Sequence, residues 1–397
     1  MISQRAINIQ PSATLKVTGR AKALKREGKS VVSLSAGEPD FKTPQYICDA
    51  AIKAIHKGQH GYTMNLGTPE LREAICEKLK RDNGLEYEPS QIICSNGAKQ
   101  SVGFALLATI DQGDEVIIPA PYWVSYPEMT RLAEGTPVTI RTSFKNNFRL
   151  TAEQLEEAIN EKTKVLILCS PSNPTGSCYS KNDLEALAEV LRSYPNIIII
   201  SDEIYEYMVF DDAHVSILNV APDLNDRVIV INGFSKGFAM TGWRLGYLAA
   251  HPDIVKAVSK IQSQETSAPS SISQAAGLAA YTNDLHEVHA MRDEFSKRRD
   301  FMVSSLNAIH GVECFTPGGA FYVFPNISEH LGKSTREGKY IESSTDLCLY
   351  LLDEFGLAVV PGDAFGEPSG LRMSYAASVE DLEEAMTRFK KGLNSLN

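Results

Sequence analysis

A lysine in a short glycine-containing run is the residue best suited to covalent chemistry. Lys236 lies in the run 232–237 (NGFSKG), directly after the apolar run Arg227–Ile231. A free lysine has a pKa near ~10.4 and is a poor nucleophile at neutral pH, so forming an imine with an aldehyde cofactor requires a lowered pKa. Ser235 and Arg244 add a hydroxyl and a guanidinium suited to a phosphate group. Taken alone, such a lysine is more often simply solvated.

A second candidate is an aspartate at the end of an isoleucine run. Asp202 follows Ile197–Ile200, and Tyr205 stands three residues further on. A buried carboxylate requires a cationic partner, and a protonated pyridine nitrogen is one such partner. Tyr205 could then donate a hydrogen bond to a ring oxygen. An aspartate that caps a helix is an equally good interpretation of this position by itself.

Three further features point to anion binding. The run 95–100 (SNGAKQ) leads a strand into a helix through Gly97, and free N–H groups at a helix start favour a phosphate. The run 170–176 (SPSNPTG) is stiffened by two prolines and could fix Asn173 beside a ring oxygen or a carboxylate. Arg372 lies inside an apolar strand and needs a carboxylate, from a substrate or from the protein. Each feature alone is weak, but together they predict one site for an anionic cofactor.

Strands that alternate with helices must position these residues. The pattern predicts an α/β fold with a mostly parallel sheet, whose carboxyl ends bind the ligand. The expected strands are 91–95, 115–119, 138–141, 164–169, 197–201 and 227–231, and the expected helices are 99–110, 151–160 and 180–193.

A smaller α+β lobe is expected after residue 285. The sequence predicts a helix over 286–310, a strand over 317–325 that is broken by glycine and proline, further strands over 357–361 and 371–375, and a closing helix from Ser378. The polar run 334–344 is expected to be a surface loop.

Bulk composition restricts the class of protein. The chain has 397 residues, a length that suits two domains or one large domain with a lobe, and its 43% hydrophobic content is ordinary for a globular protein. A net charge of −10 disfavours nucleic acid and anionic membranes as partners. No apolar run approaches the roughly 20 residues of a membrane helix.

Seven cysteines without a CxxC pair favour a reducing, cytoplasmic compartment and disfavour disulfides and a structural metal. The phosphate-binding strings GxGxxG and GxxxxGK[ST] of nucleotide folds do not occur.

The ordered motifs resemble the class I and II aminotransferases over essentially the whole chain. The matching strings are 36–41 (AGEPDF), 121–127 (PYWVSYP) and 239–244 (AMTGWR), and they are most similar to bacterial and plastid aspartate aminotransferases, some of which also act on prephenate. The resemblance implies the type I pyridoxal-phosphate fold and a homodimer with shared active sites. It also implies an N-terminal segment (1–37) that joins the small domain, a large cofactor-binding domain (38–285) and a small C-terminal domain (286–397).

The resemblance also implies roles for individual residues. Lys236 would form the imine with pyridoxal 5′-phosphate and shuttle the proton, Asp202 would pair with the ring nitrogen, and Tyr205 and Asn173 would bind the ring oxygen. Trp123 would stack on the ring. The phosphate would be held by Gly97, Ala98, Ser235, Arg244 and, from the other subunit, Tyr62. The substrate α-carboxylate would meet Arg372 and Asn173 under Gly37, and its side-chain carboxylate would meet Lys99, Ser12 and Thr14.

The implied reaction is a ping-pong transamination between L-aspartate or L-glutamate and 2-oxoglutarate or oxaloacetate. Alternatives on the same fold are a bifunctional aspartate/glutamate–prephenate aminotransferase that makes arogenate, an aromatic aminotransferase and a carbon–sulfur lyase. A pyridoxal-phosphate-binding regulator would need an additional helix-turn-helix module, for which the chain leaves no room. The expected partners are small amino acids and 2-oxo acids.

Overall fold

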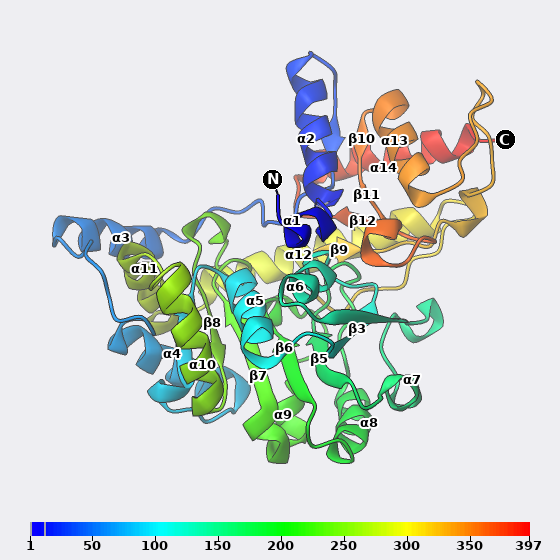
Figure 1. Cartoon of the computed structure of the whole chain (residues 1–397). Coiled ribbons are helices and arrows are strands. Elements are labelled where there is room, and N and C mark those ends of the chain that lie inside the picture. The colour runs from blue at the N-terminus through cyan, green and yellow to red at the C-terminus, as the bar shows by residue number, and fades with distance from the viewer. Residues whose placement is uncertain (1, 12) are drawn as a thin grey trace.

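A seven-stranded sheet forms the centre of the larger part of the molecule in the computed structural model, which describes residues 2–11 and 13–397 (Figure 1). β8 runs antiparallel to both its neighbours, and all other neighbouring pairs are parallel. The strands lie in the order β2 (Ile92–Ser95), β8 (Gly246–Ala249), β7 (Val228–Gly233), β6 (Ile198–Asp202), β5 (Thr163–Cys169), β3 (Glu115–Ala120) and β4 (Thr136–Arg141).

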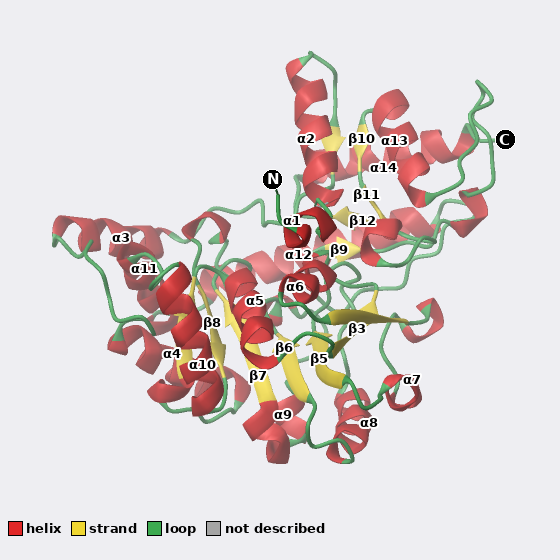
Figure 2. Cartoon of the chain, in the orientation of Figure 1, coloured by secondary structure: helices red, strands yellow, loops and turns green. Residues whose placement is uncertain are grey.

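Helices cover both faces of this sheet (Figure 2). Alternate residues of one strand enter two different apolar clusters: Val228 and Val230 belong to one, and Ile229 and Ile231 to the other. Because successive side chains of a strand point to opposite faces, both faces are buried, as the continuous apolar runs predicted. One face packs on α5 (Ala98–Thr109), α6 (Ser125–Leu132) and α10 (Pro252–Glu265); the other packs on α4 (Pro69–Asn83), α8 (Lys181–Arg192) and α11 (Ser271–Thr282).

Two small sheets and four helices form a second region. β1 (Val32–Ser33) pairs in parallel with β10 (Leu357–Ala358), and β12 (Leu371–Ser374) lies between β11 (Val360–Pro361) and β9 (Tyr322–Val323). The helices of this region are α2 (Ala13–Arg26), α12 (His286–Asn307), α13 (Ser344–Phe355) and α14 (Val379–Asn394). The N-terminal segment therefore pairs with C-terminal elements, while the domain boundaries at 37/38 and 285/286 stay a prediction.

Most of the expected elements occur within a few residues of their predicted bounds. The prediction for 317–325 was too long, since only Tyr322–Val323 forms a strand there. β8 was not predicted, because its four residues begin with glycine and include no β-branched side chain. The remaining helices are α1 (Gln4–Asn8), α3 (Gln45–His56), α7 (Ala152–Ala158) and α9 (Ile217–Val220).

The run 334–344 contains a short exposed hairpin. An antiparallel bridge joins Ser334 to Tyr340, and α13 begins at Ser344, capped by Ser343. The surface-loop prediction therefore holds up to the start of this helix.

The seven cysteines are all free, and Cys94, Cys314 and Cys348 are buried. Within the described residues, no helix is both long enough and apolar enough to span a membrane.

Candidate active site

A cavity of about 380 Å³ opens at the carboxyl ends of β5, β6 and β7. This is the sheet edge at which ligands of parallel sheets bind. The cavity brings together most of the predicted site residues: Gly37, Ala98, Lys99, Trp123, Asn173, Asp202, Tyr205, Ser235, Lys236, Arg244 and Arg372.

Lys236 follows the buried end of β7 and points its amine into the cavity. Its Nζ donates a hydrogen bond to the carbonyl oxygen of Gly37. Burial, and next the charge of Arg372, lower the pKa of Lys236 to about 8. A larger share of this amine is therefore unprotonated near neutral pH than for a solvated lysine, as imine formation requires.

Asp202 is buried at the end of β6. Its Oδ2 accepts a 2.7 Å hydrogen bond from Tyr126 Oη, and its Oδ1 accepts one of 3.3 Å from the N–H of Ile204. Burial raises the pKa of Asp202 to about 6, although these hydrogen bonds act in the opposite direction. A cation in the cavity would favour the charged carboxylate, and a protonated ring nitrogen supplies one.

Tyr126 is a site residue that the sequence reasoning missed. Its buried ring makes an edge-to-face contact with Trp123, with centroids 5.3 Å apart, while its hydroxyl holds Asp202. The signal was the three-residue spacing from Trp123, which places both side chains on one side of a helical turn. Other lining residues without a predicted role are Glu38, Val124, Ser125, Cys169, Ile204 and Thr241.

The start of α5 and Arg244 form an anion-binding end. Gly97 has a φ of +84°, and a Cβ at this position would lie 2.5 Å from Nη2 of Arg244. Only glycine therefore permits this close approach of the guanidinium to the helix start. Arg244 is oriented by a 2.8 Å hydrogen bond from Nη1 to the carbonyl of Thr241. With Ala98 and Ser235 lining the cavity, this geometry suits a phosphate.

Arg372 provides a buried cation at β12. Its Nη1 donates to Asn173 Oδ1 at 3.0 Å and its Nη2 to the carbonyl of Ser35 at 2.9 Å, while its guanidinium lies 4.7 Å from the centroid of the Tyr322 ring. Its Nε is buried without a hydrogen-bond partner. Within the described chain no carboxylate pairs with Arg372, so the protein salt bridge considered from sequence does not form there. An anionic ligand would balance this charge.

Lys99 adds a second cation to the cavity. Its Nζ lies 5.2 Å from the centroid of the Trp123 ring. Burial, and next the charge of Arg244, lower the pKa of Lys99. The cavity thus contains an amine, a buried acid, an anion-binding helix start and two further cations, which fit a phosphorylated pyridine aldehyde and an anionic substrate.

Two predicted residues, Gly97 and Tyr62, do not line this cavity in the single chain. Gly97 lies against the guanidinium of Arg244, and Tyr62 is fully exposed. Ser12 lies outside the described residues, and the side chain of Thr14, in α2, is also outside the described part of the structure.

Comparison with known proteins identifies the family. The family model for aminotransferase class I and II matches residues 29–389. A bifunctional aspartate aminotransferase and glutamate/aspartate-prephenate aminotransferase from Petunia hybrida is 50% identical, covering 99% of this chain and 82% of that protein. An aspartate aminotransferase from Rhizobium meliloti is 46% identical, covering 100% and 97%.

Solved structures agree with this assignment. The crystal structure of the Rhizobium meliloti aspartate aminotransferase superposes with a TM-score of 0.97 at 46% identity, covering 100% of both chains. Thermus thermophilus aspartate aminotransferase with maleate gives a TM-score of 0.92 at 39% identity, covering 99% of both chains. The predicted α/β fold of type I pyridoxal-phosphate enzymes is thereby confirmed. The chain belongs to the class I and II aminotransferases, enzymes that transfer amino groups with pyridoxal 5′-phosphate.

Proposed function

We propose that this aminotransferase exchanges the amino group between L-aspartate or L-glutamate and the oxo acids 2-oxoglutarate and oxaloacetate. The observation that carries this proposal is the presence of two cations, Arg372 and Lys99, in the cavity that holds Lys236. A dicarboxylate offers one carboxylate to each. The relative from Rhizobium meliloti is named an aspartate aminotransferase, and the Thermus thermophilus structure contains maleate, a dicarboxylate.

The cavity residues divide into a cofactor set and a substrate set. Pyridoxal phosphate, when bound, supplies the aldehyde and the electron sink. The cofactor set comprises Lys236 for the aldehyde, Asp202 for the ring nitrogen, Tyr205 and Asn173 for the ring oxygen, Trp123 for the ring face, and Gly97, Ala98, Ser235 and Arg244 for the phosphate.

The substrate set fixes the α-carbon for proton transfer. Arg372 and Asn173 would hold the α-carboxylate, with Gly37 closing over it, while Lys99, assisted by Ser12 and Thr14, would hold the side-chain carboxylate. Binding at both ends orients the α-hydrogen and positions it near the Lys236 amine. Nζ of Lys236 would then remove the proton from the α-carbon and later return one.

Lys99→Ala tests the role of the second cation. A charge-assisted hydrogen bond contributes about 1.5–3 kcal/mol, so kcat/KM for aspartate should fall by roughly 10- to 150-fold. Tyrosine, which lacks the second carboxylate, should lose far less. Steady-state kinetics of both substrates provide the measurement, with the exposed Lys181→Ala on α8 as the control. Equal losses for both substrates would exclude Lys99 from dicarboxylate recognition.

Prephenate is a second candidate substrate. The Petunia hybrida relative and one from Nitrosomonas europaea, 46% identical over 98% of this chain, carry prephenate in their names. Comparing aspartate, glutamate, tyrosine and prephenate as substrates of the purified enzyme tests both functions. Turnover of aspartate without turnover of prephenate would restrict the enzyme to the first function.

A homodimer is proposed as the working unit. Tyr62 is fully exposed and Met64 is 56% exposed in the single chain, which is unusual for large apolar side chains close together. A second subunit that covers them would bring Tyr62 to the partner's phosphate. The seven free cysteines support a reducing compartment such as the cytoplasm.

A further inference from the structure

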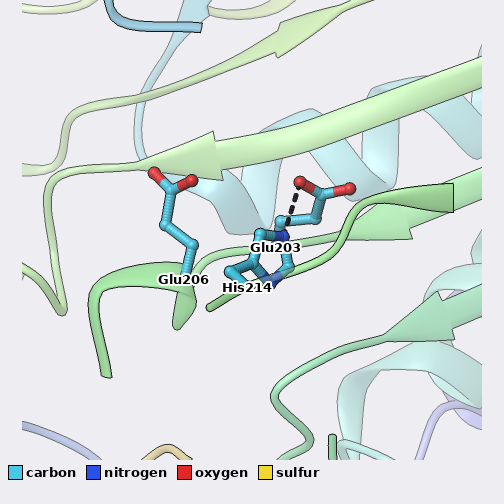
Figure 3. A group of neighbouring side chains, drawn as sticks. All are labelled: Glu203, Glu206 and His214. Atoms are coloured by element: carbon cyan, nitrogen blue, oxygen red, sulfur yellow. Dashed lines mark hydrogen bonds and ion pairs between the residues drawn. The ribbon is translucent and has the colours of Figure 1, made fainter. Parts of the chain in front are cut away.

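A cluster of mostly buried ionisable residues begins at Glu203, the residue that follows Asp202. Glu203, Glu206 and His214 each place one possible ligand atom within 4.8 Å of the others (Figure 3). Glu203 is 1% exposed and Glu206 is 7% exposed. None of the three lines the cofactor cavity.

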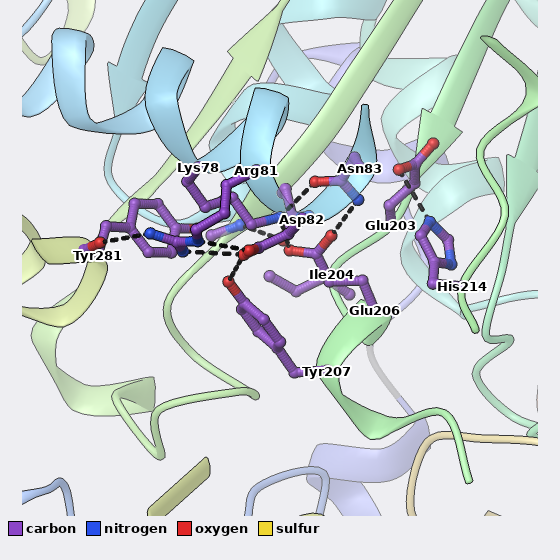
Figure 4. A network of polar contacts seen from close by, with 12 residues as sticks. Lys78, Arg81, Asp82, Asn83, Glu203, Ile204, Glu206, Tyr207, His214 and Tyr281 are labelled. Atoms are coloured by element: carbon purple, nitrogen blue, oxygen red, sulfur yellow. Dashed lines mark hydrogen bonds and ion pairs between the residues drawn. The ribbon is translucent and has the colours of Figure 1, made fainter. Parts of the chain in front are cut away.

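The contacts of this cluster argue against a metal ion. Glu206 already pairs with the ammonium of Lys78, which is fully buried, and accepts a 2.7 Å hydrogen bond from Asn83 (Figure 4). A divalent ion between the carboxylates would have to displace this ammonium from Glu206, although Lys78 is fully buried and has no access to water there. The cluster is therefore a set of protein ion pairs.

Glu203 has the most complete set of partners in the cluster. Its Oε1 accepts hydrogen bonds from Ser216 Oγ at 2.6 Å and Ser201 Oγ at 2.8 Å, and its Oε2 lies 2.9 Å from Nε2 of His214. Burial opposes ionisation of Glu203, but the charge of His214 and these hydrogen bonds prevail and lower its pKa. Burial likewise opposes protonation of His214, but the carboxylate of Glu203 prevails and raises its pKa. The 2.9 Å contact, the lowered pKa of Glu203 and the raised pKa of His214 describe a buried ion pair.

The segment 202–206 contributes to both the cavity and this cluster. Asp202, Ile204 and Tyr205 line the cavity, whereas the carboxylates of Glu203 and Glu206 bind His214 and Lys78, which do not line it. The N–H of Glu206 also donates to the carbonyl of Glu203 at 2.9 Å, which closes the segment into one turn. The peptide unit between Asp202 and Glu203 is planar. Contacts that fix the side chain and Cα of Glu203 therefore restrict the orientation of the Asp202 side chain.

We propose that Glu203, through its contacts with His214, Ser201 and Ser216, is a positioning residue that holds Asp202 aimed at the cofactor ring. His214 and Ser216 belong to a segment that follows the turn. Their contacts with Glu203 therefore hold the end of β6 against a separate part of the chain. This inference rests on the proposed pairing of Asp202 with the ring nitrogen.

Glu203→Gln tests the proposal in the holoenzyme. Glutamine keeps the size of the side chain and an acceptor for the serine hydroxyls but removes the charge that pairs with His214. Residues that orient the ligands of metal sites contribute about 10- to 100-fold, and we expect an effect of similar size here: kcat should fall by about that factor with KM nearly unchanged. The pH midpoint of the cofactor's imine absorbance should move upward, because a displaced Asp202 stabilises the protonated ring nitrogen less and the imine nitrogen then becomes more basic. The direct effect of the lost charge has the opposite sign, since the Glu203 charge raises the pKa of Asp202. An upward midpoint therefore reports displacement of Asp202, and a purely structural role would not produce it.

A matched control comes from Glu367, another buried glutamate. It is 6% exposed, accepts hydrogen bonds from Ser369 Oγ at 2.5 Å and Arg141 Nη2 at 3.2 Å, and does not line the cavity. Glu367→Gln should leave the absorbance midpoint and kcat unchanged. His214→Gln should reproduce the effect of Glu203→Gln, and the double variant should be no worse than either single one, because both remove the same ion pair.

The outcomes separate the inference from the proposed site. If Asp202→Asn is impaired while Glu203→Gln and His214→Gln match the wild type in midpoint and kcat, the positioning role is wrong and the role of Asp202 stands. If Asp202→Asn itself behaves as the wild type, the pairing of Asp202 with the ring is wrong. If Glu203→Gln fails to fold, His214→Gln and Ser216→Ala provide the test. An unchanged pH midpoint of the imine absorbance in both variants would overturn the proposal.

Discussion

Lys236 and Arg372 are two cations that share one buried cavity, and this proximity determines the chemistry of the lysine. Burial and the arginine charge both disfavour the ammonium form, which is why the pKa of Lys236 falls to about 8. Asp202 and Glu38 act in the opposite direction but do not reverse the shift. The free amine is the reactive form, so its population grows as the pH rises through 8.

This shift predicts selective labelling of Lys236. In the cofactor-free protein, trapping by a small neutral aldehyde with cyanoborohydride should rise through a midpoint near pH 8 at Lys236. Ordinary exposed lysines should follow a midpoint near ~10.4. Peptide mass mapping across a pH series gives both curves at once. A common midpoint for all lysines would contradict the lowered pKa.

At the residue scale, side-chain chemistry identified most of the cavity residues. It did not predict contacts between residues that are far apart in the sequence. Lys236, Asp202 and Arg372 were recognisable because each is a charged group beside or inside an apolar strand. Tyr126 was missed because its partner Asp202 is 76 positions away. The pair of Glu206 with Lys78 was missed for the same reason, because Lys78 in α4 lies more than a hundred positions from Glu206.

At the element scale, the antiparallel strand β8 lies directly against the start of α5. A Cβ on Gly246 would lie 2.3 Å from the backbone nitrogen of Ala98 and 2.6 Å from the carbonyl carbon of Gly97. The position of the helix start, and with it the phosphate-binding end of the cavity, therefore depends on a strand residue without a side chain.

Gly246→Ala should consequently weaken cofactor retention. The added methyl group must push the start of α5 away, and such overpacking costs about 1–3 kcal/mol. Fluorescence titration with pyridoxal phosphate and thermal unfolding measure the two effects. Gly103→Ala, in the same helix with nothing within 4 Å of the new methyl, should leave cofactor affinity unchanged. Equal behaviour of the two variants would contradict the steric argument.

Hydrophobic pattern predicted β3, β5, β6 and β7 well because these strands are buried on both faces. It did not predict β8, which begins with glycine and contains no β-branched residue, or the pairing of β1 with β10. Strand pairing depends on contacts between segments far apart in the chain, which a local pattern does not encode.

At the scale of the whole molecule, the exposed Tyr62 predicts complementation between damaged subunits. Lys236→Ala and Tyr62→Ala proteins should each be impaired alone. Mixed dimers, formed by dissociation and reassociation, would contain one site with Lys236 from one chain and Tyr62 from the other. Activity of the mixture should therefore exceed that of either variant. No recovery in confirmed mixed dimers would contradict a shared site.

The pairing of β1 with β10 has a consequence for synthesis on the ribosome. Val32 emerges 325 positions before Leu357, its partner strand residue. The central sheet, which ends at Ala249, is complete in the growing polypeptide long before that partner is translated. The apolar residues Val31 and Leu34 must meanwhile stay unpaired, or be shielded by a chaperone, until the last part of the nascent chain leaves the exit tunnel.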